Sequence, residues 1–264
     1  MKRISIRAIA ALSVAALIAA WAFGFLRTSN DGSLRTAEAR AFLTEKVPDS
    51  LDVKPGQVLH THTDVYTRFG PKAAEIAAGT GIMTENHVRE SWQQIADDGS
   101  LAASYARVID ATGAVVQESV SRPGEIRSID PRSNSVIKSA GPDNPITASS
   151  TQITTPKGRA LAYEQALRDG RARVLNQTPD ELSLEISDQL PQIAQDKQWG
   201  PGEYQVPYTG DLRPTALITK VTVRADGVVT SSEGYALTSS GKRVLIQSEH
   251  STTEILDQLP ALPF

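Results

Sequence analysis

The chain offers little metal-binding chemistry, because it contains four histidines and no cysteine. His60 and His62 are two residues apart in a segment of β-forming residues, so on a strand both side chains face the same way and could share a metal ion. His87 and His250, the other two histidines, stand at no regular spacing from this pair. We therefore expect no metal site. The lack of cysteine also excludes disulfides, thiolate nucleophiles and a lipid-modified cysteine.

Three short strings resemble functional motifs. Ser135 and Lys138 have the Ser-x-x-Lys spacing of serine acyl enzymes, but the surrounding residues predict a strand where that chemistry needs a helix. Ser239–Lys242 lacks the first glycine of a phosphate-binding loop and indicates a hairpin turn. Asn176-Gln-Thr178 fits a glycosylation acceptor, yet Thr178 also suits a helix cap. No nucleophile, base and orienting acid can be named together, so we expect neither an enzyme nor a cofactor.

Aromatic and branched residues on predicted strands are the candidates for binding a ligand. In Ala216–Arg224, apolar and polar residues alternate, so one face of that strand is expected to be buried and could line a cavity. The alternative is that these side chains fill a core between sheet and helices. The six candidates are Trp92, Tyr105, Leu217, Val221, Val223 and Tyr235.

Composition narrows the class of partner. The chain has 264 residues, 40% of them hydrophobic, with a formal net charge of −3 and a pI of about 5.9. It is long enough to bury a sizeable core in one large domain or two small ones. Because there is no overall positive charge to attract phosphates, we expect no nucleic-acid partner.

The N-terminal residues predict a membrane anchor. Residues 8–26 carry no charge and follow Lys2, Arg3 and Arg7. A helix of this length spans the hydrocarbon layer of about 30 Å, and the basic flank keeps the N-terminus cytoplasmic. The chain would then be a single-pass protein of the cell membrane with its C-terminal part outside the cytoplasm. A cleaved signal peptide is the alternative, because Ala20-Trp21-Ala22 fits the small-x-small cleavage pattern.

Beyond residue 26 the pattern predicts a juxtamembrane stalk with a helix at Thr36–Lys46, filling residues 27–56, and then one domain over 57–264. Its first half reads as six antiparallel strands joined by short turns, and its last third as three more. The expected strands are Gln57–Phe69, Asn86–Ala96, Leu101–Ile109, Ala114–Val120, Glu125–Ile129, Ser135–Lys138, Ala216–Arg224, Val228–Thr238 and Arg243–Leu256.

Between these two sets of strands the sequence predicts a helical insert. One helix is expected over Gly158–Asn176, weakened at Gly170. A second begins at Thr178, where a capping hydroxyl precedes Pro179, and ends near Pro191. The predicted fold is therefore α+β, a strongly curved antiparallel sheet, or half-barrel, covered by two helices and preceded by a transmembrane helix.

This layout and four segments within it resemble the outer-membrane lipoprotein carriers (LolA-like) and the RseB-like periplasmic proteins. The segments are Val58–Tyr66, Val88–Gln93, Ile129–Val136 and the meander Leu217–Leu256 before Leu259-Pro260. The resemblance implies a half-open barrel covered by helices, with a hydrophobic cavity that receives acyl chains, or a sensing domain that regulates a membrane partner. The chain departs from lipoprotein members in having no cysteine for acylation.

Two functions follow as expectations. The first is a membrane-anchored extracytoplasmic domain that binds or senses a lipid or other apolar ligand. The alternative is an extracytoplasmic protein-interaction or regulatory module, of the envelope or anti-sigma type, with a filled core and no cavity.

Overall fold

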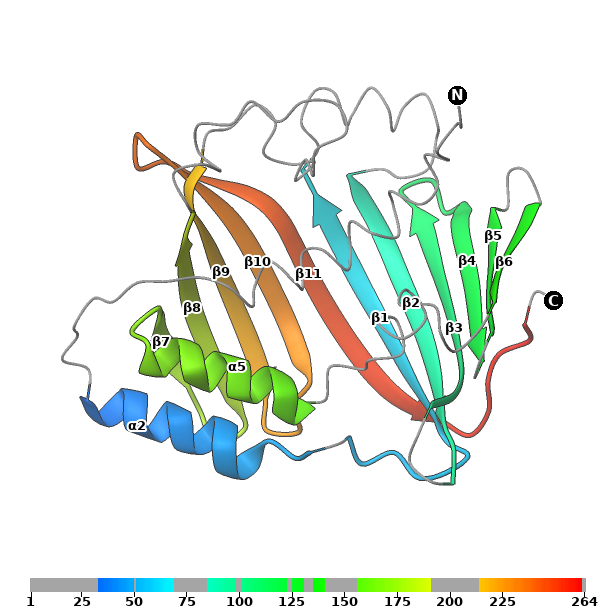
Figure 1. Ribbon diagram of the computed structural model, residues 1–264, viewed down its shortest axis with the longest axis horizontal. Coiled ribbons are helices and arrows are strands. Elements are labelled where there is room, and N and C mark those ends of the chain that lie inside the picture. Colours follow the sequence, from blue (N-terminus) through cyan, green and yellow to red (C-terminus); the bar gives the residue numbers. More distant parts are fainter. Residues whose placement is uncertain are drawn as a thin grey trace.

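The computed structural model describes residues 33–49, 51–68, 85–97, 101–122, 125–130, 135–140, 156–190 and 214–262. These residues form one antiparallel sheet in the order β6-β5-β4-β3-β2-β1-β11-β10-β9-β8-β7 (Figure 1). Its N-terminal meander comprises β1 (Val58–Thr67), β2 (Asn86–Ile95), β3 (Leu101–Asp110), β4 (Val115–Arg122), β5 (Glu125–Asp130) and β6 (Ser135–Ala140).

The C-terminal meander begins at the other edge of the sheet and returns to its middle. It comprises β7 (Ala172–Gln177), β8 (Glu181–Gln189), β9 (Pro214–Arg224), β10 (Val229–Thr238) and β11 (Arg243–Leu256). Pairing of β1 with β11, from Val58 opposite Leu256 to Thr67 opposite Gln247, joins the two meanders. The described edge strands β6 and β7 do not pair with each other, so the sheet is open. All nine strands expected from the sequence are confirmed, and the structure adds β7 and β8.

Two helical segments lie on one face of the sheet, at its β7–β10 end (Figure 1). The first is α2 (Ser33–Ala41), which continues as a π-helical turn, η2 (Phe42–Lys46); the second is α5 (Pro156–Arg168). We call the sheet face that they cover the helix face and the opposite one the outer face. The core between helices and sheet contains Ala39, Phe42, Leu43, Val47, Ala160, Ala166, Leu167, Leu182, Leu184, Ile186, Val221 and Val223.

The predicted juxtamembrane helix is therefore present, but it is not a separate stalk. Phe42, Leu43 and Val47 are at most 2% exposed and belong to the same core as strands β8 and β9. The Lys157 ammonium of α5 donates to the carbonyl oxygens of Thr44, at 2.5 Å, and Val47, at 3.1 Å, which satisfies acceptors at the end of η2. The described residues 33–49 thus fold as part of the sheet domain.

The prediction of one helix over Gly158–Asn176 is wrong in its second half. Helix α5 stops at Arg168, and Gly170 follows with φ of 69°. The amide of Arg171 donates to the Ala166 carbonyl, at 2.9 Å, and that of Gly170 to the Leu167 carbonyl, at 3.2 Å, which is the Schellman pattern. Glycine here ends the helix, because it adopts the left-handed conformation without strain.

The predicted helix after Thr178 is also wrong, since this segment is strand β8. The Thr178 hydroxyl does accept from the amides of Asp180, at 3.3 Å, and Glu181, at 3.0 Å, but the turn that it closes joins β7 to β8. A threonine hydroxyl stabilises tight turns and helix starts by the same local hydrogen bond. The apolar residues after it, Leu182, Leu184 and Ile186, alternate with period two and point to the helix face.

The predicted anchor at residues 8–26 lies outside the described residues. Among the residues that the structure does describe, no helix is long and apolar enough to cross a membrane.

Candidate ligand-binding site

The six candidate residues are divided between the two faces of the sheet. Val221 and Val223 are 3% and 2% exposed and pack under the helices opposite Leu184 and Leu182. Leu217 shares their face, because it stands four residues from Val221 on the same regular strand, and it is only half-buried. The alternation predicted for this strand is confirmed from Thr219 to Arg224, whereas Ala216 and Ile218, on the opposite face, are 0% and 3% exposed. Val221 and Val223 lie in a filled core.

The three aromatic candidates lie on the outer face. Trp92 pairs with His60, which pairs with Glu254 on β11. Glu249 lies on the helix face, where it lines the pocket described below. Glu254 is five residues further along the same strand and so points to the opposite side, and His60 and Trp92, in register with it, therefore also lie on the outer face. Tyr105 pairs with Trp92 and shares its face.

Tyr235 is also on the outer face, because it pairs with Ile218, three residues from Val221. Its hydroxyl donates to Glu233, at 2.7 Å; that bond and burial raise the pKa of Tyr235 to about 12. The six residues therefore do not form one pocket, and binding by any of them stays a prediction.

His60 and His62 share a face as expected, and Glu90 lies near both. His60 Nε2 and His62 Nδ1 are 3.8 and 3.5 Å from the same Glu90 oxygen, while the Arg107 guanidinium bonds the other oxygen at 2.5 Å. The described residues hold no group of three or more potential ligands placed for a metal ion.

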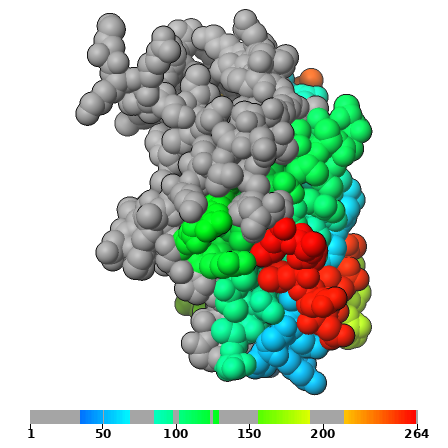
Figure 2. All heavy atoms as spheres, turned by 90° about the vertical axis from the view of Figure 1, so that its right-hand side faces the viewer, coloured from blue at the N-terminus to red at the C-terminus, as the bar shows by residue number. Residues whose placement is uncertain are grey.

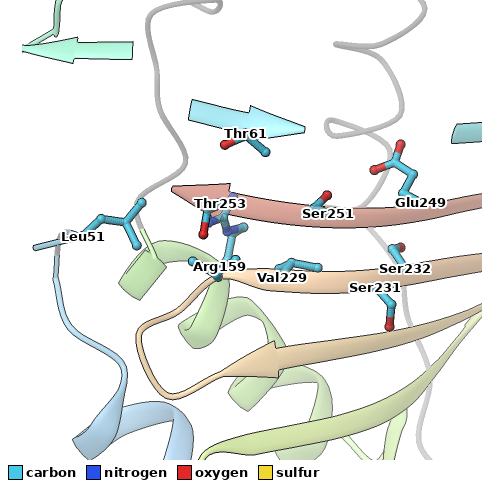
Figure 3. Close-up of a pocket in the computed structure, with 10 residues that line it drawn as sticks. Leu51, Thr61, Arg159, Val229, Ser231, Ser232, Glu249, Ser251 and Thr253 are labelled. Atoms are coloured by element: carbon cyan, nitrogen blue, oxygen red, sulfur yellow. The ribbon is translucent and has the colours of Figure 1, made fainter. Parts of the chain in front are cut away.

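A pocket does open on the helix face, beside the helices (Figure 3). It has a volume of about 190 Å³ and is partly open to solvent. Five of its ten lining residues carry hydroxyls, three are apolar and two are charged. They are Leu51, Thr61, Arg159, Val228, Val229, Ser231, Ser232, Glu249, Ser251 and Thr253.

Strands β10, β11 and β1 form the floor of the pocket through those of their side chains that point to the helix face. Ser232 is in register with Val221 on one side and Glu249 on the other, and Thr61 with Thr253. Along this row of paired residues, the helix face thus changes from the apolar Val221 beneath the helices to the Ser232 hydroxyl and the Glu249 carboxylate beyond them. Apolar contacts come from Val228, just before β10, from Val229, the first residue of β10, and from Leu51.

Arg159 on α5 supplies the positive charge of the pocket (Figure 3). Its Nη2 makes a long contact of 3.4 Å to the Gly227 carbonyl, and its Nε is buried without a hydrogen-bond partner. No carboxylate of the described residues forms an ion pair with it. A buried donor without an acceptor costs about 1–3 kcal/mol, so this guanidinium favours a ligand that carries an acceptor.

Glu249, the other charged lining residue, is already paired. Its carboxylate accepts from Arg89 Nη2 at 2.5 Å and from Gln247 Nε2 at 2.6 Å. Its negative charge is therefore largely balanced within the sheet, which leaves Arg159 as the lining group with an unmet electrostatic demand.

Sequence reasoning missed this pocket. Its clearest signal was Ser251 and Thr253, at alternate positions of a strand predicted correctly, together with the hydroxyl residues Thr61, Ser231 and Ser232 on neighbouring strands. The predicted binding residues were apolar and aromatic, and the pairing that brings β1 beside β11 joins segments far apart in the chain.

The chain matches no protein-family model and no curated protein sequence. Solved structures similar to it include an uncharacterized conserved protein from Thermus thermophilus, with 8% identity and a TM-score of 0.35, covering 86% of this chain and 90% of that one. A LolA superfamily protein from Nitrosomonas europaea has 8% identity and a TM-score of 0.25, covering 86% and 94%. TM-scores below 0.5 do not establish a shared fold, so membership of the LolA-like or RseB-like families stays a prediction.

Proposed function

We propose that this protein is a binding domain for an amphipathic ligand, and that the ligand's acidic or otherwise hydrogen-bond-accepting group is held by Arg159 in the helix-face pocket. The observation that carries the proposal is the buried Nε of Arg159, which has no acceptor, at the side of a pocket with both apolar and hydroxyl lining. Leu51, Val228 and Val229 offer contact to an apolar chain, and the hydroxyls offer contact to a polar group.

The size of the pocket restricts what it holds. Sites that enclose a drug-sized ligand measure about 300–1,000 Å³, and this pocket has about 190 Å³. It therefore accommodates a head group and the first carbons of a chain, with the rest of the ligand outside. A lipid with a carboxylate or phosphate head has this chemistry.

The test uses residues 33–264 and two fluorescent probes, dansylaminoundecanoic acid and the corresponding dansyl undecanol. Arg159→Gln should weaken binding of the acid about tenfold or more, the value of one charge-assisted hydrogen bond, and leave the alcohol nearly unchanged. An equal loss of affinity for both probes would show that Arg159 does not hold the acidic group of the ligand.

Substitution of two adjacent threonines on β11 tests whether the ligand binds in the pocket. Thr253→Trp places a ring in the pocket, whereas Thr252→Trp places the same ring on the outer face, where Thr252 is exposed. The first should abolish binding of both probes and the second should not. Native mass spectrometry of the unsubstituted segment then identifies any lipid that is retained during purification.

The proposal also includes the anchor. With residues 8–26 in the membrane and Lys2, Arg3 and Arg7 on the cytoplasmic side, the domain stands outside the cytoplasm and meets membrane lipids directly. The protein should stay with membranes after a carbonate wash and be cut by protease added from outside. Release of a shortened soluble form would instead indicate a cleaved signal peptide.

A further inference from the structure

The chain beyond β11 returns over the outer face of the N-terminal meander. Four side chains, one from each of β1 to β4, form an apolar cluster there, and all are at most 6% exposed. Leu256, at the end of β11, and Leu259 and Leu262, beyond it, pack against this cluster. Figure 2 shows the C-terminal atoms, in red, lying against those of the N-terminal strands. The outer-face cluster consists of Val58, Trp92, Tyr105 and Val120.

Parallel rings stiffen this cluster. The rings of His60 and Trp92 stack with centroids 4.6 Å apart and planes 6° apart, and Trp92 stacks on Tyr105 at 5.0 Å and 16°. The Arg107 guanidinium lies 5.2 Å from the Trp92 ring, and the Tyr105 hydroxyl donates to Glu118. Because these partners fix the rings in place, the aromatic surface does not depend on the tail for its shape.

The tail has the spacing of a polyproline II ligand. Pro260 restricts its own φ and favours an extended conformation for Leu259. Polyproline II has three residues per turn, so Leu259 and Leu262 fall on one side. These two residues pack against the cluster, while Ala261 between them is exposed. Proline-rich segments dock on aromatic grooves in this way.

The tail is held by side chains alone. Within the described residues, 257–262 form no strand and make no backbone hydrogen bond to the sheet. Its release therefore removes the contacts of two half-buried leucines and breaks no sheet ladder. Segments without backbone hydrogen bonds to the sheet can open locally at a free energy below that of global unfolding.

We propose that the outer-face cluster is a peptide-binding groove for an extended Leu-Pro-x-Leu segment, and that the chain's own residues 257–262 occupy it as an exchangeable ligand. The partner is a proline-rich segment of another protein with two leucines three residues apart. The tail competes with this partner at an effective concentration on the order of millimolar, as for other short tethers. The groove is thus accessible only to a partner that displaces the tail.

The first test uses the full-length chain in nanodiscs and a fluorescein-labelled peptide with the sequence of residues 257–264. The double variant Leu259→Ser with Leu262→Ser empties the groove, so it should bind the peptide at least tenfold more tightly than the unsubstituted chain. A peptide with both leucines replaced by serine should not bind. The control variant, Leu175→Ser with Ile255→Ser, removes two exposed apolar side chains that lie outside the cluster and should behave like the unsubstituted chain.

A folded double variant that shows no saturable binding of the peptide would overturn the proposal. If the double variant does not fold, a second measurement decides. The chain has no cysteine, so a single introduced thiol reports local opening. The thiol of Leu262→Cys should react with iodoacetamide at least 100-fold faster than that of Leu182→Cys, in the helix-face core, while the circular dichroism spectrum stays native. Equal rates would show that the tail opens only when the domain unfolds, which also overturns the proposal.

Discussion

A Cβ atom built on Gly227 would lie 2.4 Å from the Cβ of Pro156, so the β9–β10 turn and the first turn of α5 touch where a side chain does not fit. Gly227 also has φ of 83°, which other residues rarely adopt. The same turn brings the Gly227 carbonyl to Arg159. This contact positions the N-terminal end of α5, and with it the guanidinium over the pocket.

Gly227→Ala should destabilise the domain more than Gly241→Ala. Both glycines have positive φ, at 83° and 79°, but a Cβ at Gly241 meets nothing within 4 Å. The Gly241 variant should lose about 1–2 kcal/mol from backbone strain, and the Gly227 variant a further 1–3 kcal/mol or so from overpacking. Urea unfolding followed by circular dichroism measures both. Equal losses would show that Pro156 moves aside at no cost.

Glu164 joins the two helices, and its removal should weaken the domain in a pH-dependent way. Glu164 is 3% exposed, and its carboxylate accepts from Arg40 at 2.7 Å and from Arg168 at 2.9 Å. Burial raises its pKa, but the two arginines outweigh burial and hold the pKa below its ordinary value. Glu164→Gln should cost about 1–3 kcal/mol at pH 7. The matched control is Glu38→Gln, an exposed glutamate of α2, with a change within about 0.5 kcal/mol.

The sign of the pH effect follows from that lowered pKa. A carboxyl whose folded-state pKa is below its unfolded value, about 4.3, stabilises the fold fully above the unfolded value and loses this stabilisation as pH falls through the folded one. The melting temperatures of the unsubstituted chain and Glu164→Gln should therefore converge as pH falls below about 4.3. Glu90 and Glu185 also have lowered pKa values, so the variant still loses stability in acid. A constant difference from pH 7 to pH 3 would contradict this assignment.

His60→Ala and His62→Ala should change the stability of the domain by different amounts, and we expect neither histidine to hold a metal. His60 stacks on Trp92 and its Nδ1 lies 2.8 Å from Glu254, whereas the His62 side chain is 39% exposed. His60→Ala should cost about 1 kcal/mol, as for other stacked ring pairs, and His62→Ala close to nothing. Melting curves and metal analysis of both variants check this. Stoichiometric zinc in the unsubstituted protein that is lost in either variant would overturn it.

Local pattern predicted nine strands because each combines β-forming residues with a turn residue of fixed conformation, such as Gly113 with φ of 85° or Gly227. It failed after Thr178, because a threonine hydroxyl makes the same local hydrogen bond in a tight turn as at the start of a helix. The apolar residues that follow were therefore assigned the helical period of 3.6 residues instead of the strand period of two. The alternation Leu182, Leu184, Ile186 was the better signal.

The site was harder to predict because it depends on pairing between strands far apart in the chain. Thr61 and Thr253 line one pocket only because β1 pairs with β11, and no local pattern specifies that register. The sheet also has two faces, and local alternation does not say which face of one strand continues which face of another. Trp92 and Val221 were for this reason grouped together although they lie on opposite sides.

Val221→Asp and Ser232→Asp should separate the filled core from the open pocket. The two residues are register partners on β9 and β10 and share the helix face. Val221 is 3% exposed beneath the helices, so a carboxylate there has no partner and costs several kcal/mol. Native stability is only about 5–15 kcal/mol, so this variant should be largely unfolded or melt far below the unsubstituted chain.

Ser232 lines the same pocket as Arg159 and is half-buried, so a carboxylate introduced there reaches solvent. That variant should keep its fold and lose affinity for dansylaminoundecanoic acid, because its carboxylate repels that of the probe. Melting curves and probe titrations of both variants are the measurements. An unchanged melt for Val221→Asp would show that the β9 side chains point the other way. Unfolding of Ser232→Asp would show that Ser232 is packed in the core and not in an open pocket, which leaves no room for the proposed ligand.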